Sequence, residues 1–332
     1  MRQRLLFWLA ACLAGCVLHA CTKAEKPVTF VIVSDLHAQD VPDGKARMQA
    51  VARAAAEAKA DFVVQLGDFV RPDSTGNALR RAWEQCPCSI YHVLGNHDMD
   101  RYTKEEYMHA LDMPARYYSF DRGGFHFVVL DGNNLYDGKE YRPYAKSNFY
   151  GKAGTGSYID PEQMAWLKTD LEATDKRCVV FSHQSIDTFL DNGEAVRRVL
   201  EAENRRCGFA KVVLAFSGHN HSNYRKDIDG IAYIQVNSAS YVWIGRPSLS
   251  EQRYPDSINA RYPLLGRSIP YDRPLYAVVT LRTDGATLRG VRGAFVPPLP
   301  EAVGLGDSIG PYPLVPFIAD DEIRFPARRR GQ

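Results

Sequence analysis

The sequence contains no apolar run long enough to cross a membrane, and its charges nearly cancel. The apolar run over residues 5–18 is shorter than the roughly 18–20 residues that a transmembrane helix needs. Lys and Arg number 41 and Asp and Glu number 39, so the net charge is +2. We expect no nucleic-acid partner recognised through overall charge, although a local basic groove would escape this argument. With 45% apolar and 24% charged residues, the composition is that of a globular protein.

The N-terminus has the parts of a secretory signal: Arg2 and Arg4 precede the apolar run, and small residues precede a Cys. The segments ending at Cys16 and Cys21 both resemble the lipobox of bacterial lipoproteins, whose Cys is lipidated after cleavage. The first segment matches the motif better, whereas cleavage before Cys21 leaves an even number of Cys for disulfides further along. We therefore expect an exported lipoprotein, periplasmic or at the cell surface, with its lipid on Cys21 or Cys16. A cleaved signal peptide without a lipid is the alternative.

Short β-branched runs alternate with helix-like stretches along the rest of the chain, without an internal repeat, which predicts an α/β domain. One helix start is well marked, because Asp160 is suited to the N-cap, Pro161 to the first position and Gln163 to closing a capping box. The expected strands are 30–33, 62–64, 90–94, 125–130, 179–181, 212–216, 231–236 and 275–281, and the expected helices are 46–60, 78–84 and 160–175. We divide the chain into a signal (1–20), a linker (21–27), one domain (28–295) and a Pro/Gly-rich tail on its surface (296–332).

Five of the apolar runs end in Asp, Asn or His. The residues at these strand ends are Asp35 and His37, Asp68, Asn96 and His97, His183, and His219 and His221. The carboxyl ends of strands in an α/β sheet line one crevice, so we expect these side chains to meet there. Five of the nine His in the chain belong to this set.

These side chains are those of a metal site. Asp and His without Cys suit divalent Mn, Zn or Fe better than a thiolate site does. The seven candidate ligands are Asp35, His37, Asp68, Asn96, His183, His219 and His221. One tetrahedral ion uses four ligands, so seven indicate two ions that share a bridging carboxylate. Such a pair clamps the attacking and leaving oxygens of a displacement at phosphorus and makes hydroxide available near neutral pH.

The same segments, in order, resemble the motif set of the calcineurin-like metallophosphoesterase family. They are Asp35-Leu-His37, Gly67-Asp68, Gly95-Asn-His-Asp98, His183 and Gly218-His-Asn-His221. The resemblance covers roughly residues 28–245 and implies a β-sandwich flanked by helices, with a dinuclear metal site on loops between strands. The first motif, which contains His37, is similar to that of class III cyclic nucleotide phosphodiesterases and of many bacterial phosphoesterases of broad specificity.

The resemblance also implies a role for each residue. It assigns Asp35, His37 and His221 to one metal ion, it assigns Asn96, His183 and His219 to the other, and it makes Asp68 the bridge. His97 would face the substrate and donate a proton to the leaving group, and Asp98 would orient its imidazole through a hydrogen bond.

The long segment between the strand that ends at Asp131 and the helix that starts at Asp160 is a candidate wall of the substrate pocket. We expect Tyr144 to stack on an organic group and Arg142 or Lys146 to contact phosphate. A second candidate wall contains Asn237. The sequence thus predicts an exported phosphoesterase that cleaves small phosphate mono- or diesters with metal-activated hydroxide. The alternatives are a phosphodiesterase acting on cyclic nucleotides or nucleotide diphosphates, and a surface binding protein without catalysis.

Overall fold

The computed structural model describes residues 26–327, apart from residue 84 and residues 151–155. The expected signal, with Cys16 and Cys21, lies outside the described residues. Within the described part, no helix combines the length and the apolar character that a membrane span requires.

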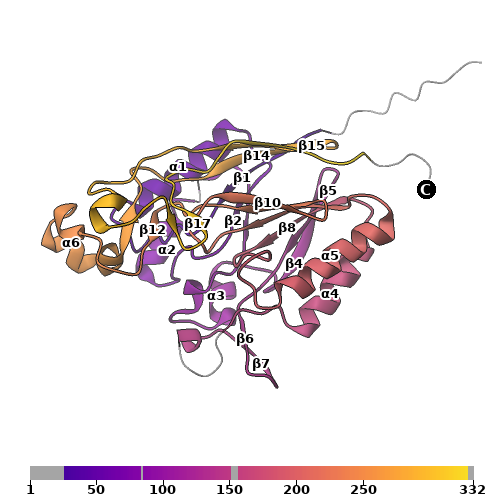
Figure 1. The fold of residues 1–332 in the computed structure, drawn as a ribbon, viewed down its shortest axis with the longest axis horizontal. Helices are drawn as coiled ribbons and strands as arrows, with labels where there is room; N and C mark the ends of the chain where they lie inside the picture. Colours follow the sequence, from indigo (N-terminus) through magenta and orange to yellow (C-terminus); the bar gives the residue numbers. More distant parts are fainter. Residues whose placement is uncertain (1–25, 84, 151–155, 328–332) are drawn as a thin grey trace, which may run out of the picture.

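Two six-stranded sheets form the centre of the molecule (Figure 1). In spatial order, the first sheet consists of β18 (Asp321–Arg324), β15 (Gly285–Gly290), β14 (Ala277–Arg282), β1 (Val28–Val33), β2 (Phe62–Gln65) and β3 (Ser89–His92). The second consists of β10 (Tyr224–Ile228), β11 (Ile231–Gln235), β9 (Val212–Ser217), β8 (Arg177–Ser182), β5 (Phe125–Val129) and β4 (Tyr118–Arg122). Strands β1, β2 and β3 are parallel, as are β5, β8, β9 and β11, so each sheet brings several carboxyl ends to one edge.

The remaining elements are shorter. Three two-stranded ribbons pair β6 (Asn134–Tyr136) with β7 (Tyr141–Pro143), β12 (Tyr241–Trp243) with β13 (Ser268–Pro270), and β16 (Ser308–Ile309) with β17 (Tyr312–Pro313). The α-helices are α1 (Gly44–Glu57), α2 (Ser74–Arg80), α3 (Lys104–Ala110), α4 (Pro161–Glu172), α5 (Gly193–Cys207) and α6 (Asp256–Arg261). The 3-10 turns are η1 (His97–Met99), η2 (Asn148–Tyr150), η3 (Ser250–Gln252), η4 (Pro263–Arg267) and η5 (Pro300–Val303).

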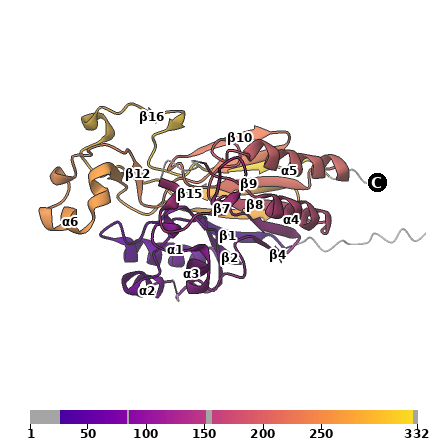
Figure 2. The ribbon, with the colours of Figure 1, turned by 90° about the horizontal axis from the view of Figure 1, so that it is seen from below.

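The sheets pack face to face because successive side chains of a strand point to opposite faces. In β1, Phe30 and Ile32 belong to the core between the sheets, whereas Val31 and Val33 belong to the outer core. The outer face of the first sheet packs on α1, and that of the second packs on α4 and α5 (Figure 2). The α/β sandwich flanked by helices is therefore confirmed.

Two local expectations need correction. Helix α2 begins at Ser74, four residues before the predicted start, because the side chain of Asp73 accepts a hydrogen bond from the backbone N–H of Gly76 at 2.8 Å. Asp160 does cap α4, as expected, but Gln163 closes no capping box. Its side chain instead exchanges two hydrogen bonds with the backbone of Asp131, at 2.8 and 2.9 Å.

The C-terminal segment is more than a surface tail. Strand β18 pairs with β15 and forms the edge of the first sheet, with Ile323 opposite Ala286. Leu314, Ile318 and Ile323 are buried in the core between the sheets. This part of the chain belongs to the domain, because its apolar side chains complete the domain's core.

Candidate metal centre

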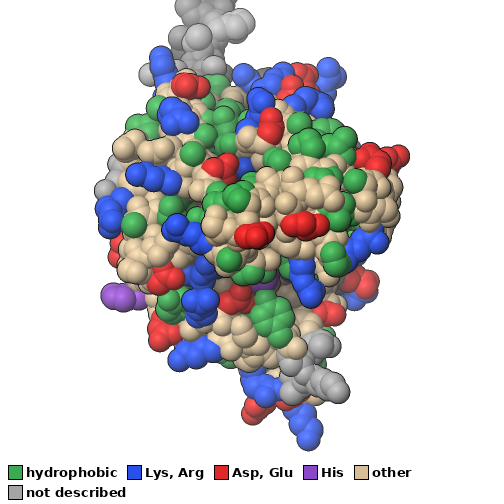
Figure 3. Space-filling view, turned by 90° about the vertical axis from the view of Figure 1, so that its left-hand side faces the viewer, with side chains coloured by type: hydrophobic (Ala, Val, Ile, Leu, Met, Phe, Trp, Pro, Cys, Tyr) green, Lys and Arg blue, Asp and Glu red, His purple; other side chains and the backbone are tan. Residues whose placement is uncertain are grey.

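The predicted ligands converge at the edge where the carboxyl ends of the two sheets meet. Asp35, Asp68 and Asn96 follow β1, β2 and β3 of the first sheet. His183 follows β8 of the second sheet, and His219 and His221 follow β9. In the space-filling view, one patch of His atoms lies in a hollow of the face shown, with acidic, basic and apolar side chains around it (Figure 3).

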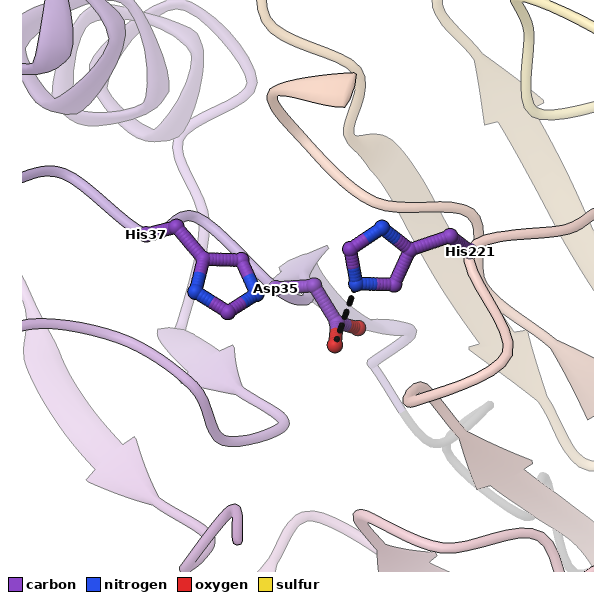
Figure 4. Close-up of side chains that lie close together, drawn as sticks. All are labelled: Asp35, His37 and His221. Atoms are coloured by element: carbon purple, nitrogen blue, oxygen red, sulfur yellow. Dashed lines mark ion pairs between the residues drawn. The ribbon is translucent and has the colours of Figure 1, made fainter. Parts of the chain in front are cut away.

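One group of potential ligands consists of Asp35, His37 and His221, all buried (Figure 4). Nε2 of His221 lies 3.2 Å from Oδ1 of Asp35. The Nδ1 of His221 lies 2.8 Å from the carbonyl oxygen of Tyr241, which can only accept a hydrogen bond, so Nδ1 carries the proton. In the neutral imidazole the lone pair is then on Nε2 and points at Asp35, which is the orientation of a metal-binding histidine.

The second group consists of Asp68, His183 and His219. Nδ1 of His183 donates to the carbonyl of Leu66 at 2.7 Å, which again directs Nε2 into the site. The Oδ1 of Asn96 lies 3.0 Å from that Nε2 and 2.9 Å from Nδ1 of His219. This amide oxygen is therefore a further potential ligand of the second group.

Asp68 lies between the two groups. Its Oδ2 is 3.2 Å from Nε2 of His183 and 3.8 Å from Nε2 of His37, which belongs to the first group. This is the position that a bridging carboxylate requires. The division of the ligands that the family resemblance implied agrees with this geometry.

The backbone at the site adopts a conformation that side chains disfavour. Five of the potential ligands have a positive φ between 44° and 72°, where residues other than Gly are uncommon. They are Asp35, His37, Asp68, His219 and His221. Clustered strain of this kind is typical of functional sites, where the surrounding structure holds residues in place for their chemistry.

The glycines of the motifs allow the loops to approach one another. A Cβ on Gly95 would lie 2.2 Å from the backbone nitrogen of Asp68, and one on Gly218 would lie 1.8 Å from Oγ of Ser34. Both contacts are shorter than real Cβ contacts, so only glycine fits where the loops from different strands cross.

The electrostatics of the site favour a bound cation. Burial lowers the pKa of His37 and of His219 to about 3, so their nitrogens offer lone pairs at neutral pH. Burial also lowers the pKa of His183, but Asp68 and Asp35 outweigh it and raise this pKa to about 9. The carboxylates thus attract positive charge to Nε2 of His183.

An unpaired atom gives a further test of this fit. Oδ1 of Asp35 is buried and has no hydrogen-bond partner. A buried carboxylate oxygen without a partner is costly, and divalent cations bind such oxygens together with imidazole nitrogens. The residues present therefore fit a pair of divalent ions.

His97 lies beside the ligands, as expected, but Asp98 does not orient it. The carboxylate of Asp98 accepts hydrogen bonds from the backbone N–H groups of Gly95 at 2.7 Å and Phe69 at 3.1 Å, and so joins the loops after β2 and β3. The carboxylate that contacts the imidazole of His97 is that of Asp100, whose Oδ2 lies 3.0 Å from Nδ1. Asp98 therefore supports the site through the backbone rather than through the imidazole.

Asn237 has structural contacts instead of a place in a substrate pocket. It is fully buried, and its amide donates to the carbonyls of Val315 at 2.7 Å and Phe317 at 3.2 Å. Its Oδ1 accepts from the hydroxyl of Tyr271 at 3.1 Å and from the backbone N–H of Ser238 at 2.8 Å. With these bonds made, the side chain of Asn237 holds the C-terminal segment, and both its oxygen and its nitrogen are already engaged.

The predicted pocket wall also needs revision. Arg142 lies on the β6–β7 ribbon, which projects from the body of the molecule, and is paired with Asp137 at 3.2 Å (Figure 1). Tyr144 is buried, and its hydroxyl donates to the carbonyl of Gly156 at 2.8 Å. Lys146 is exposed, and its backbone N–H donates to the carbonyl of Tyr102. None of these contacts joins the three side chains to the centre.

Other residues contact the centre instead, and none of them is among the four candidate substrate-binding residues. Tyr150, from the same long segment, places its hydroxyl 2.9 Å from Nδ1 of His97. The ring of Phe189 lies edge-on to that of His219, with centroids 3.9 Å apart. Arg71 is the one Lys or Arg among the residues that line a pocket beside His37, Asp68 and His97. Arg71 lies three residues after the Gly-Asp motif, so its position in the sequence could have placed it near the centre.

The family model that describes the calcineurin-like phosphoesterases matches residues 28–223, which is more than half of the chain. The chain belongs to this family. Among curated proteins, none matches the chain. A solved dimetal phosphatase from Danio rerio is similar in fold, with 16% identity and a TM-score of 0.55, over 81% of this chain and 98% of that one. The Plasmodium protein GAP50, described as the anchor in the inner membrane complex, gives 14% identity and a TM-score of 0.52, over 91% of this chain and 90% of that one. The structures similar to this chain thus include a phosphatase and an anchor, so the shared fold does not by itself determine the activity.

Proposed function

We propose that the chain is an exported hydrolase that cleaves small phosphate esters at a centre of two divalent ions. One observation carries the proposal: two groups of potential ligands, each drawn from both sheets, lie close together, and the carboxylate of Asp68 reaches toward both. When bound there, divalent ions supply Lewis acidity toward phosphoryl oxygens and lower the pKa of a water.

The chain's own side chains would bind and orient the ester. Arg71 lines the pocket beside the centre, and its guanidinium is held by Asp40, with hydrogen bonds of 3.0 and 3.1 Å. A guanidinium held in this way suits the oxygens of a phosphate. We therefore expect Arg71, instead of Arg142 or Lys146, to contact the phosphate.

His97 favours an enzyme over a binding protein. Its side chain is 39% exposed and lines the same pocket, so it is accessible to a bound ester. Burial lowers its pKa, but Asp68 and Asp100 outweigh that effect and raise the pKa to about 9. A protonated imidazole beside the centre is suited to donate a proton to a leaving oxygen, which capture of a ligand alone does not require.

The test is turnover of p-nitrophenyl phosphate beside bis-p-nitrophenyl phosphate, with protein stripped of metal and refilled with Mn, Zn or Fe. We expect turnover that depends on the metal, and we expect Asp68→Asn to lower kcat about a thousandfold because the shared carboxylate is lost. The ratio of the two rates distinguishes a monoesterase from a diesterase, including one that acts on cyclic nucleotides or nucleotide diphosphates.

A matched control is Asp137→Asn, which makes the same change at an exposed carboxylate in the turn between β6 and β7. This variant should retain full activity. The metal content of each protein is measured in parallel. If the wild type binds two ions per chain and cleaves neither ester, the hydrolase proposal is wrong for these ester classes and the binding protein becomes the better explanation.

A further inference from the structure

His97 has two partners that come from different parts of the chain. Asp100 closes the 3-10 turn that begins at His97, and its backbone N–H donates to the carbonyl of His97 at 3.2 Å. Residues three apart in such a turn lie on the same side, which brings the carboxylate against the imidazole. A carboxylate only accepts hydrogen bonds, so Nδ1 of His97 is the donor in the 3.0 Å contact with Oδ2.

Tyr150 reaches this pair from the long segment that precedes α4. Its hydroxyl donates to Oδ1 of Asp100 at 3.1 Å and lies 2.9 Å from Nδ1 of His97. The hydroxyl therefore holds the second oxygen of the carboxylate while the first accepts from the imidazole. His97, Asp100 and Tyr150 form a closed set of contacts, which we call the His97 triad.

The segment that carries Tyr150 is attached to the turn at His97 by two more bonds. The backbone N–H of Ser147 donates to the carbonyl of Met99 at 3.1 Å, and its Oγ donates to the carbonyl of Asp100 at 2.7 Å. Tyr150 thus approaches from a fixed direction, although the residue is 61% exposed.

The triad leaves one nitrogen of His97 free for the reaction. Nδ1 is committed to Asp100 and Tyr150, and the backbone N–H of His97 donates to Oδ1 of the bridging Asp68 at 2.8 Å. His97 is therefore held at two points, its backbone N–H and the Nδ1 of its ring, next to the carboxylate of Asp68. Its Nε2 is the atom that remains to meet a substrate.

The geometry points to Asp100 and Tyr150 as positioning residues that hold His97 as the acid for the leaving group, an inference that rests on the proposed function. As the P–O bond to the leaving group breaks, its electron pair stays on the leaving oxygen, which takes the proton from Nε2 of His97. Water supplies the new oxygen on phosphorus, and a proton released from that water into solvent balances the one that His97 later regains. Asp100 and Tyr150 fix the orientation of the imidazole through their contacts with Nδ1.

The test compares phosphate monoesters whose leaving groups need the acid to different degrees. 2,4-Dinitrophenolate leaves without protonation, whereas phenolate and alkoxides need it. We expect Asp100→Asn to lower kcat for phenyl phosphate about 10–100-fold while KM and the rate with 2,4-dinitrophenyl phosphate barely change. Tyr150→Phe should show the same pattern more weakly, because Asp100 still accepts from Nδ1. Asp100→Glu should recover part of the rate.

Matched controls are Asp137→Asn and Tyr141→Phe, which make the same chemical changes on the β6–β7 ribbon and should leave every ester unaffected. A readout independent of activity is NMR of the metal-free protein, in which long-range proton–nitrogen correlations show which ring nitrogen of His97 carries a proton. There we expect a protected proton on Nδ1 that exchanges faster in Asp100→Asn.

An equal loss with all leaving groups would overturn the inference, because Asp100 would then act through metal binding or folding. A wild type that hydrolyses no ester with any metal would remove the proposed function and this inference together. Turnover in the wild type with unchanged phenyl phosphate rates in both variants would remove only the inference.

Discussion

Asn237 shows how a residue at a strand end can serve the fold rather than the chemistry. It is fully buried just after β11, and two of its four hydrogen bonds join this loop to the C-terminal segment. We expect Asn237→Ala to lower the free energy of unfolding by about 1–3 kcal/mol, because buried carbonyls and a hydroxyl lose their partner. KM for a phosphate ester should not change.

Urea denaturation measures the first effect and steady-state kinetics the second. Gln252→Ala, which removes an amide from an exposed position, is the control and should affect neither. A raised KM with unchanged stability would contradict this prediction and would indicate that Asn237 contacts the substrate.

The sequence brought the potential metal ligands together, but not the residues around them. Asp35 and Asp68 lie within three residues of the ends of buried strands, so one rule about strand ends places them together. Asp100 and Tyr150 follow no strand. Their role depends on a 3-10 turn and on a segment that approaches from 50 residues further along the chain, which no local pattern contains. Asn237 does follow a strand, but its partners lie 78 and 80 residues away, so its structural role could not be predicted locally either.

At the scale of elements, one imidazole joins three of them. His126 on β5 contacts Asp121 of β4 through Nδ1 and Asp170 of α4 through Nε2, both at 2.8 Å. Burial lowers its pKa, but these two carboxylates outweigh burial and raise it. Lys176 and Ser119 face the same carboxylates, Lys176 on Asp121 and Ser119 on Asp170. The charged imidazole is thus the form that holds α4 against the edge of the second sheet.

A pKa that is raised in the folded state makes stability depend on pH with a definite sign. The contribution of His126 is complete below its unfolded pKa of about 6.5 and is lost as the pH rises through the higher folded pKa. We expect the stability difference between the wild type and His126→Gln to shrink as the pH rises above 6.5. Unfolding measured at a series of pH values checks this; a difference that grows with pH would contradict it.

The elements themselves followed from the sequence to different degrees. The buried strands β1, β2, β8 and β9 lie where β-branched runs predicted them, because a strand covered on both faces reads as a continuous apolar run. Strand β18 was missed, since its sequence Asp-Glu-Ile-Arg is mostly polar. An edge strand buries only some of its side chains, so its place depends on the neighbouring β15 rather than on its own composition.

At the scale of the whole molecule, the place of action is still a prediction. We propose that the chain is exported and carries a lipid on Cys16 or Cys21. Metabolic labelling of the full chain in a bacterial host with a fatty acid should label the wild type, and the label should be lost in either Cys16→Ser or Cys21→Ser. An unlabelled protein released from the membrane would favour a plain signal peptide instead.

The long pairing between β1 and β14 has a consequence for how the protein is made. β1 pairs on one side with the nearby β2, but on its other side Val28 lies opposite Leu281, about 250 residues later in the chain. Closing a contact over that distance is slow, because the intervening chain must lose its freedom first. The first sheet is therefore complete only after nearly all of the described chain has been synthesised.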